Sequence, residues 1–487
     1  MTDIATIQQE SDARRAIAHF AALSWQDEAT ADELLIDGDP FRRPTRAKDL
    51  PHLALNRAVP MARLAGNSAL VLHRLLFNAY ETDLLFLPLA KESAGESGWR
   101  NFDLFYGADT ASRAGAARPH LENLAFADLE ASIDITGPWS AEPALARLRD
   151  FLTAEETAPT DDLADPVMAA LLNAADPRAA AGHYLVQMAP DFLSEASAMA
   201  RLAPGAYGPL QSSLFNVLID EYGAAVHGAK HSTLFEATLA SIGLDCRPHA
   251  YWQFYQPGSL ALANYFHYVA ANKRHVFRYL GALFYTEASL VNVTGRQART
   301  LRRIFGNEID LRYFDEHHHI DRHHRQMVLT RLIEPAIATC GPRAIEGILR
   351  GFEEFRLLQE LADRDLADQL GWAGAVRPND PKLAPFLADW RAGRLDSETF
   401  REVHDERSTT HIHPDDRLLV IETGTMTFFP LAGVELRLIA GDALFIPGGR
   451  LHGSIVTSPD STYHQPILPP ESAATLWQRP SAAMGAA

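Results

Sequence analysis

The 487-residue chain is 47% hydrophobic and 22% charged, the composition of an ordinary folded protein of about three domains, which excludes collagen-like, low-complexity and disordered chains. Its net charge of −18 argues against nucleic acid or an anionic membrane as the main partner. Two isolated cysteines, Cys246 and Cys340, disfavour a disulfide framework and a thiolate zinc site. The N-terminus has no apolar h-region typical of an export signal, and no apolar run approaches the length of a membrane span. With so few cysteines a reducing compartment is the default, so we expect a cytoplasmic protein.

The predicted elements begin with helices. Residues 1–135 are expected to be helical, with apolar residues at helical spacing over 67–87. Residues 136–375 are again helical, with breaks at 203–209 and 340–343, and they predict a bundle of roughly seven helices.

The pattern of apolar residues, prolines and glycines changes near the C-terminal end of that region. Prolines within 371–385 indicate a linker. After about residue 407, short apolar runs alternate with turns that contain Gly or Pro, which is typical of a small antiparallel barrel. We therefore assign residues 376–487 to a third domain and expect a multidomain α + β fold.

Histidines are concentrated at one place in the helical region. Of the 20 histidines, five fall between positions 317 and 324. His317, Asp321 and His324 are spaced i, i+4 and i+7, so on a helix they share one face. The Asp-x-x-His pair is a carboxylate counterpart of the Glu-x-x-His pair in di-iron helical bundles. The alternative is a solvated polar helix that binds no metal. Candidate metal ligands in other segments are needed to decide between the two.

Three carboxylates in separate helical segments are candidate partners. They are Glu195, Glu221 and Glu287, the last inside an apolar stretch. A buried carboxylate is costly unless it is paired or bound to a metal. For any single glutamate a salt bridge or an exposed position is the ordinary alternative, but three of them together with a His/Asp/His face favour a metal site.

Two further histidines, His227 and His231, follow Glu221 along the chain. His231 lies off the face that Glu221 occupies on an ideal helix. A break near Gly223 or Gly228 is therefore needed to turn both side chains inward.

The C-terminal region carries a second histidine cluster, in HIHPDDRLLVIETG and GDALFIPGGRLHG. Strand alternation places His411 and His413 on one side, and a neighbouring strand supplies His452. These segments resemble the two cupin motifs, which implies a mononuclear iron site. The usual Glu position of the first motif holds Arg417, whose guanidinium cannot ligate a metal. A cupin retained only for packing is the alternative.

The central motifs HYLVQMAPDFLSEAS, IDEYGAAVHGAKHSTLFE, FYTEASLV and HHHIDRHH resemble those of the heme-oxygenase-like di-iron oxidases, here fused to a cupin. The resemblance implies that the iron is nonheme iron and that no heme is bound. It also implies that the enzyme uses O2 and an external reductant, and that it forms a homodimer through residues 1–135. It places His227, His318, His319 and His323 around the site or at the surface. The di-iron ligands that it implies are Glu195, Glu221, His231, Glu287, His317, Asp321 and His324.

The resemblance also implies an activity. We expect the di-iron domain to hydroxylate guanidine nitrogens of an N-methyl-arginine-like substrate, and the cupin iron to rearrange the product to an N-nitroso compound, a nitrosourea. One alternative is a guanidine N-hydroxylase whose cupin is inactive because of Arg417. Another is oxidative C–C cleavage of an acid by the di-iron centre. A metal- or ligand-sensing protein is a third, which the absence of a basic patch or a helix-turn-helix disfavours.

Overall fold

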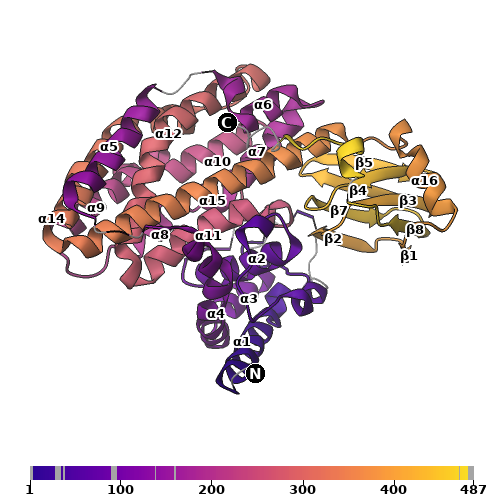
Figure 1. The fold of residues 1–487 in the computed structure, drawn as a ribbon, viewed down its shortest axis with the longest axis horizontal. Coiled ribbons are helices and arrows are strands. Elements are labelled where there is room, and N and C mark those ends of the chain that lie inside the picture. Colours follow the sequence, from indigo (N-terminus) through magenta and orange to yellow (C-terminus); the bar gives the residue numbers. More distant parts are fainter. Residues whose placement is uncertain are drawn as a thin grey trace.

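The computed structural model describes residues 4–27, 35, 36, 39–88, 96–135, 137, 139–157, 161–470 and 472–480. A long helical bundle lies beside a β-region, and the N-terminal helices lie along one side of both (Figure 1). None of the described helices combines the length and apolarity needed to cross a membrane.

The N-terminal region is helical, as the sequence predicts. Its central helix, α2, contacts α4, α11 and the strand β2, which explains why it is buried nearly all round. Its described α-helices are α1 (Ile4–Ala21), α2 (Asn67–Glu81), α3 (Glu96–Phe105) and α4 (Ala108–Ser132).

The bundle follows. Its longest helices, α12 and α15, lie side by side, and they approach closely because Gly281 and Gly351 leave out a side chain where one backbone meets the other. The described α-helices of the bundle are α5 (Ala141–Thr157), α6 (Pro166–Asn173), α7 (Pro177–Phe192), α8 (Ser197–Ala200), α9 (Pro209–Glu221), α10 (His231–Ser241), α11 (Pro257–Ala271), α12 (Val276–Phe305), α13 (Arg312–Met327), α14 (Glu334–Cys340) and α15 (Pro342–Ala375).

The β-region consists of two four-stranded antiparallel sheets, ordered β1-β8-β3-β6 and β2-β7-β4-β5, an arrangement consistent with a cupin-like barrel. In the second sheet His411 and His452 are directly opposite each other in the register of β2 and β7. The strands are β1 (Ser397–Val403), β2 (Arg407–Ile412), β3 (Arg417–Thr423), β4 (Thr425–Leu431), β5 (Val434–Ile439), β6 (Ala443–Ile446), β7 (Leu451–Val456) and β8 (Asp460–Pro466).

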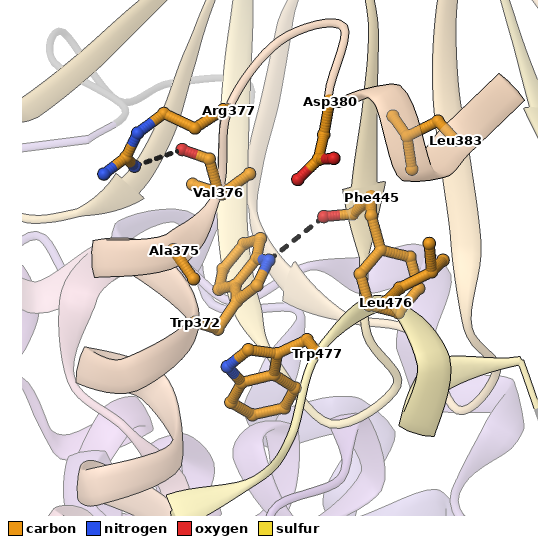
Figure 2. A pocket seen from close by; sticks show the side chains of 9 residues that line it. All are labelled: Trp372, Ala375, Val376, Arg377, Asp380, Leu383, Phe445, Leu476 and Trp477. Atoms are coloured by element: carbon orange, nitrogen blue, oxygen red, sulfur yellow. Dashed lines mark hydrogen bonds between the residues drawn. The ribbon is translucent and has the colours of Figure 1, made fainter.

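The C-terminal end of α15 joins the bundle to the sheets. Figure 2 shows Trp372 of α15 donating from its indole nitrogen to the carbonyl of Phe445 in β6, at 3.0 Å. The hollow beside it, about 340 Å³, is also lined by Trp477, which follows the short helix α17 (Ala473–Leu476). The helix and the sheet are therefore in direct contact rather than joined by a free tether.

The structure differs from the sequence prediction at this junction. Helix α15 continues to Ala375, and α16 (Ala384–Arg391) follows, so the predicted linker at 371–385 was too long. The first strand, β1, begins at Ser397, ten residues before the predicted β-region. It was missed because its residues are mostly exposed and polar, so they give no apolar signal.

Candidate metal centres

Two groups of potential ligands in the bundle share one carboxylate. Glu195, Glu221, His231 and His317 form the first, and Glu221, Glu287 and His324 the second; within each group the donor atoms lie within 4.8 Å of one another. Six of the seven side chains predicted for the di-iron site are therefore brought together. The seventh, Asp321, is on α13, but its side chain lies outside the described part of the structure.

The two oxygens of Glu221 face different groups. Its Oε2 lies 2.6 Å from His231 Nδ1 and 4.0 Å from His317 Nε2. Its Oε1 lies 3.6 Å from His324 Nδ1, which in turn is 3.4 Å from Glu287 Oε2. This is the geometry of a carboxylate that bridges two neighbouring cation sites.

A break between α9 and α10 positions Glu221 and His231, as the sequence predicts. Glu221 is the last residue of α9 and His231 the first of α10. Between them Gly223 has φ +59°, and a Cβ there would overlap the backbone of Ala229 and Lys230. Only glycine fits this turn, which folds the chain back so that both side chains point inward.

Two histidines of α13 are oriented by hydrogen bonds from their other ring nitrogens. His317 Nδ1 lies 2.9 Å from the carbonyl of Tyr313, and His324 Nε2 lies 3.2 Å from the carboxylate of Asp220. Donation from these nitrogens directs His317 Nε2 and His324 Nδ1 toward the ligand groups, the orientation found in metal-bound histidines.

The other histidines predicted near the site lie outside the ligand groups. His318 is half-buried, and its Nδ1 lies 2.7 Å from the carbonyl of Val291. His227, His319 and His323 are exposed.

Three further residues at the site were missed by the sequence reasoning. Tyr313 donates from its hydroxyl to Glu195, Asp220 accepts from His324, and Asp191 lines the cleft beside the ligands. Tyr313 precedes His317 by one helical turn, so spacing gave a signal. Asp220 gave none, because neighbouring residues on a helix point in different directions.

The electrostatics of this cluster favour a cation. Burial lowers the pKa of His324, but hydrogen bonds to Glu287 and Asp220 and the charges of Glu287 and Glu221 outweigh it and raise that pKa to about 10. Burial and the nearby charges of Glu195 and Glu221 raise the pKa of Asp191 to about 7. The buried Glu195 Oε2 has no hydrogen-bond partner among the described residues. Carboxylate and imidazole donors with an uncompensated negative charge fit a pair of iron ions.

An open cleft of about 580 Å³ gives access to the cluster. Glu195, Glu221, Glu287 and His317 line it, together with apolar side chains of α11 and α12. A small molecule in this cleft lies directly against the ligand groups.

The third ligand group lies in the β-region and contains the three predicted histidines, His411, His413 and His452. Nε2 of His411 and Nε2 of His413 are 3.1 Å apart. Nδ1 of His411 donates to the carbonyl of Thr409 and Nδ1 of His452 to that of Arg450, each at 2.9 Å. The buried Nε2 of His452 has no hydrogen-bond partner in the described structure, so the three imidazoles fit one metal ion.

Burial, assisted by nearby positive charge, keeps His413 and His452 neutral. Burial lowers the pKa of His413 to about 2 and that of His452 to about 4, and the cations Arg417 and Arg46 act in the same direction. A neutral imidazole is the form that ligates a metal.

Arg417 occupies the position where the cupin motif usually has a glutamate. Its guanidinium is buried and donates to Glu398 and, at 3.2 Å, to Gln465. It therefore adds positive charge beside the histidines without supplying a ligand.

Comparison with known proteins agrees with this geometry. Residues 182–360, which include all the ligand groups of the bundle, match the family model of an iron-containing redox enzyme. The chain is 41% identical over 428 residues to the nitrosourea synthase of Streptomyces achromogenes subsp. streptozoticus, and the match covers 87% of this chain and 89% of that enzyme. The chain therefore belongs to the family of that nitrosourea synthase, and its residues 182–360 form a heme-oxygenase-like domain of the iron-containing redox enzymes.

Proposed function

We propose that this protein is a nonheme-iron, O2-dependent N-oxygenase that converts a guanidine substrate resembling N-methyl-arginine to an N-nitrosourea. The observation that carries the proposal is the carboxylate of Glu221, which is shared by two ligand groups. Carboxylate bridging is typical of di-iron centres in helical bundles. The identity with a nitrosourea synthase supports the product class.

The first stage is hydroxylation of guanidine nitrogens in the bundle. Iron held by the two ligand groups would supply the activation of O2. Each hydroxylation replaces one N–H by N–OH, consumes one O2, two electrons and two protons, and releases one water. Because each turnover consumes two electrons that neither the substrate nor O2 supplies, an external reductant provides them.

The second stage takes place at His411, His413 and His452. A guanidine that carries two N-hydroxyl groups has two more hydrogens and one less oxygen than the corresponding N-nitrosourea. One O2 with release of one water balances the step, so no further reductant is needed. One C–N bond breaks, an N–N bond forms, and the central carbon becomes a urea carbonyl. Neutral histidines and the nearby cation Arg417 favour an electron-rich, hydroxylated ligand at this centre.

The test is incubation of the iron-loaded protein with N-methyl-L-arginine, O2 and a reductant, followed by mass spectrometry. We expect oxygen to be added first and an N-nitroso product to follow. An additional variant, Asp321→Ala, is expected to abolish hydroxylation, because loss of a charged ligand retunes or empties the iron site. O2 uptake that is triggered only by an apolar acid, with no turnover of the guanidine, would contradict the proposal and favour oxidative C–C cleavage.

The replacement of the usual glutamate by Arg417 favours a second candidate function. In it the protein is a guanidine N-hydroxylase whose β-region carries out no chemistry. Accumulation of the hydroxylated guanidine without rearrangement, in protein that contains iron in the β-region, supports this candidate over the first.

We also propose that the protein forms a homodimer through its N-terminal region. Large apolar side chains are exposed there, with Leu85 73%, Leu87 60%, Trp99 50% and Leu104 45% exposed. Exposed apolar groups of this size are typical of protein interfaces. Sedimentation of the wild type and of the variant Trp99→Glu is expected to give a dimer and a weakened dimer, respectively, and a monomeric wild type contradicts the proposal.

A further inference from the structure

A second, larger cavity adjoins the cleft beside the bundle ligands. Its volume is about 1380 Å³, and side chains of α5, α6, α7, α11, α12 and α15 line it. The residues common to the two hollows are Asp191, Phe192, Phe266, Thr286 and Leu290. A ligand in the larger cavity therefore reaches the metal-facing cleft past Asp191.

The charged lining of this cavity is mostly acidic. It contains the carboxylates of Glu155, Asp165, Asp191 and Asp363 and the guanidinium of Arg296. An excess of carboxylates in a hollow of the protein core favours a ligand that carries positive charge, since buried charges need partners.

Three of the four carboxylates accept at most one hydrogen bond from the described protein. Asp165 caps α6 by accepting from two backbone N–H groups. Asp191, by contrast, accepts no hydrogen bond from a described residue, and Asp363 accepts one, from Gln359 at 2.9 Å. Glu155 likewise accepts one, from Asn292 at 3.3 Å. Asp191, Asp363 and Glu155 therefore have free acceptor capacity toward a ligand.

An uncharged side chain in the same lining independently indicates a ligand. Gln297 is only 6% exposed, and its amide nitrogen donates to the hydroxyl of Tyr184. Its buried Oε1 has no hydrogen-bond partner among the described residues. Buried polar atoms in folded proteins are nearly always satisfied, so this acceptor requires an N–H or O–H donor that the described protein does not supply.

The lining also offers one cation. Arg296 Nε is buried without a hydrogen bond to a described residue, and its nearest carboxylate oxygen, on Asp165, is 3.6 Å away. Its fork of donors suits a carboxylate. The cavity thus combines acceptors for two cationic groups with a donor for one anionic group.

We propose that this cavity binds a basic α-amino acid, with its guanidinium at Asp191, its α-ammonium at Asp363 and its α-carboxylate at Arg296. This assignment rests on the proposed function, which requires a guanidine nitrogen beside the bundle ligands. Asp191 lies at the opening toward those ligands, so the guanidinium end of the substrate is the end that meets them. Asp363 and Arg296 line only the larger cavity, which suits the distal end of the same molecule.

The experiment measures binding by calorimetry to iron-loaded protein without O2, so that no turnover occurs. The ligands are N-methyl-L-arginine, its decarboxylated analogue N-methylagmatine, and its 2-deamino analogue. The variants are Asp363→Asn, Arg296→Gln and Asp191→Asn, with Asp150→Asn, an exposed carboxylate of α5, as the matched control.

We expect Asp363→Asn to weaken binding of N-methyl-L-arginine by about 10- to 100-fold, the usual effect of losing a hydrogen bond to a charged group. The same variant is expected to leave the affinity for the deamino analogue unchanged. Arg296→Gln is expected to weaken binding of N-methyl-L-arginine but not of N-methylagmatine. If a variant weakens binding of N-methyl-L-arginine and of its paired analogue by the same factor, the assignment of the substituted residue is wrong.

Asp191→Asn is expected to weaken all three ligands by a similar factor, because each retains the guanidinium, and to leave the iron content unchanged. Loss of iron instead would show that Asp191 serves the metals and overturn its assignment. The proposed function fails separately: if the wild type binds the amino acid with this pattern but does not oxidise it when O2 and reductant are added, the binding site stands and the reaction is wrong.

Discussion

At the scale of single residues, Glu221 has the most consequential position. It is the only residue that belongs to both ligand groups of the described bundle, and it is buried. Glu287 belongs to one group alone. The two carboxylates are therefore not equivalent, although both are glutamates that face His324.

This difference predicts the outcome of two substitutions. Glu221→Ala is expected to remove iron from both positions of the bundle, because each loses a ligand, whereas Glu287→Ala is expected to deplete one. The measurement is iron content per chain after desalting, with Mössbauer spectra to separate coupled from isolated ions. The bridging role is wrong if both variants retain the same amount of iron.

Asp220 gives a second prediction at this scale. Its carboxylate accepts from His324 Nε2 at 3.2 Å, and such partners of metal-binding histidines typically change metal affinity by about 10- to 100-fold. Asp220→Asn removes the charge but keeps an acceptor, so we expect about a tenfold weaker iron affinity, measured by titration. Asp315→Asn, an exposed position on α13, is the control and is expected to match the wild type.

At the scale of elements, the α9–α10 break determines whether the ligands converge. Gly223 has a positive φ and no room for a Cβ, whereas a Cβ added to Gly228, in the same loop, would have nothing within 4 Å. The loop therefore contains a glycine that the geometry requires and one that it does not.

We expect Gly223→Ala to displace the loop and separate Glu221 from His231. A left-handed backbone costs a non-glycine residue about 1 kcal/mol or more, and the overlap with Ala229 adds to this. Iron content and hydroxylation should both fall sharply, while Gly228→Ala should stay near the wild type in both. Equal behaviour of the two variants would show that the break does not position the ligands.

The elements also show how far the sequence alone was sufficient. The spacing of His317 and His324 and the glycine-rich segment after Glu221 predicted the convergence that the structure has, because helix periodicity and backbone sterics are local. The strand β1 and the acceptor role of Asp220 were not predictable, because an exposed edge and a contact between α9 and α13 depend on the tertiary fold. The residues of the large cavity were likewise scattered over six helices.

At the scale of the whole molecule, His183 connects the bundle to the β-region. It lies on α7, is fully buried, and its Nδ1 accepts from the backbone N–H of Ala432 in the turn after β4, at 3.1 Å. Burial lowers the pKa of His183 to about 3. The folded protein thus holds this imidazole neutral, while the unfolded chain protonates it below its ordinary pKa of about 6.5.

This predicts a pH dependence with a definite sign. Above pH 6.5 the residue is neutral in both states and its effect on stability is constant; as the pH falls from 6.5 toward 3, the unfolded state takes up the proton first and stability declines. From pH 7.5 to 5.0 the loss is about 2 kcal/mol. His183→Asn keeps an acceptor but does not titrate, so urea midpoints of this variant should fall less over that range. Parallel curves for the two proteins would refute the assignment.

The separation of the two metal centres gives the last prediction. The ligands of the bundle and those of the β-region share no residue, and the sheets lie on the side of the bundle away from α9 (Figure 1). His411 is 8% exposed and points toward His413 and His452, so removing its imidazole changes the β-region centre without touching a bundle ligand.

We therefore expect His411→Ala to retain the rate of guanidine hydroxylation and to lose formation of the N-nitroso product, as followed by mass spectrometry of the same reaction over time. His404→Ala, an exposed histidine of the β-region, should form both products at wild-type rates. If His411→Ala loses both reactions while its bundle iron remains in place, the division of labour between the two centres is wrong, since the hydroxylation would then depend on the integrity of the distant site.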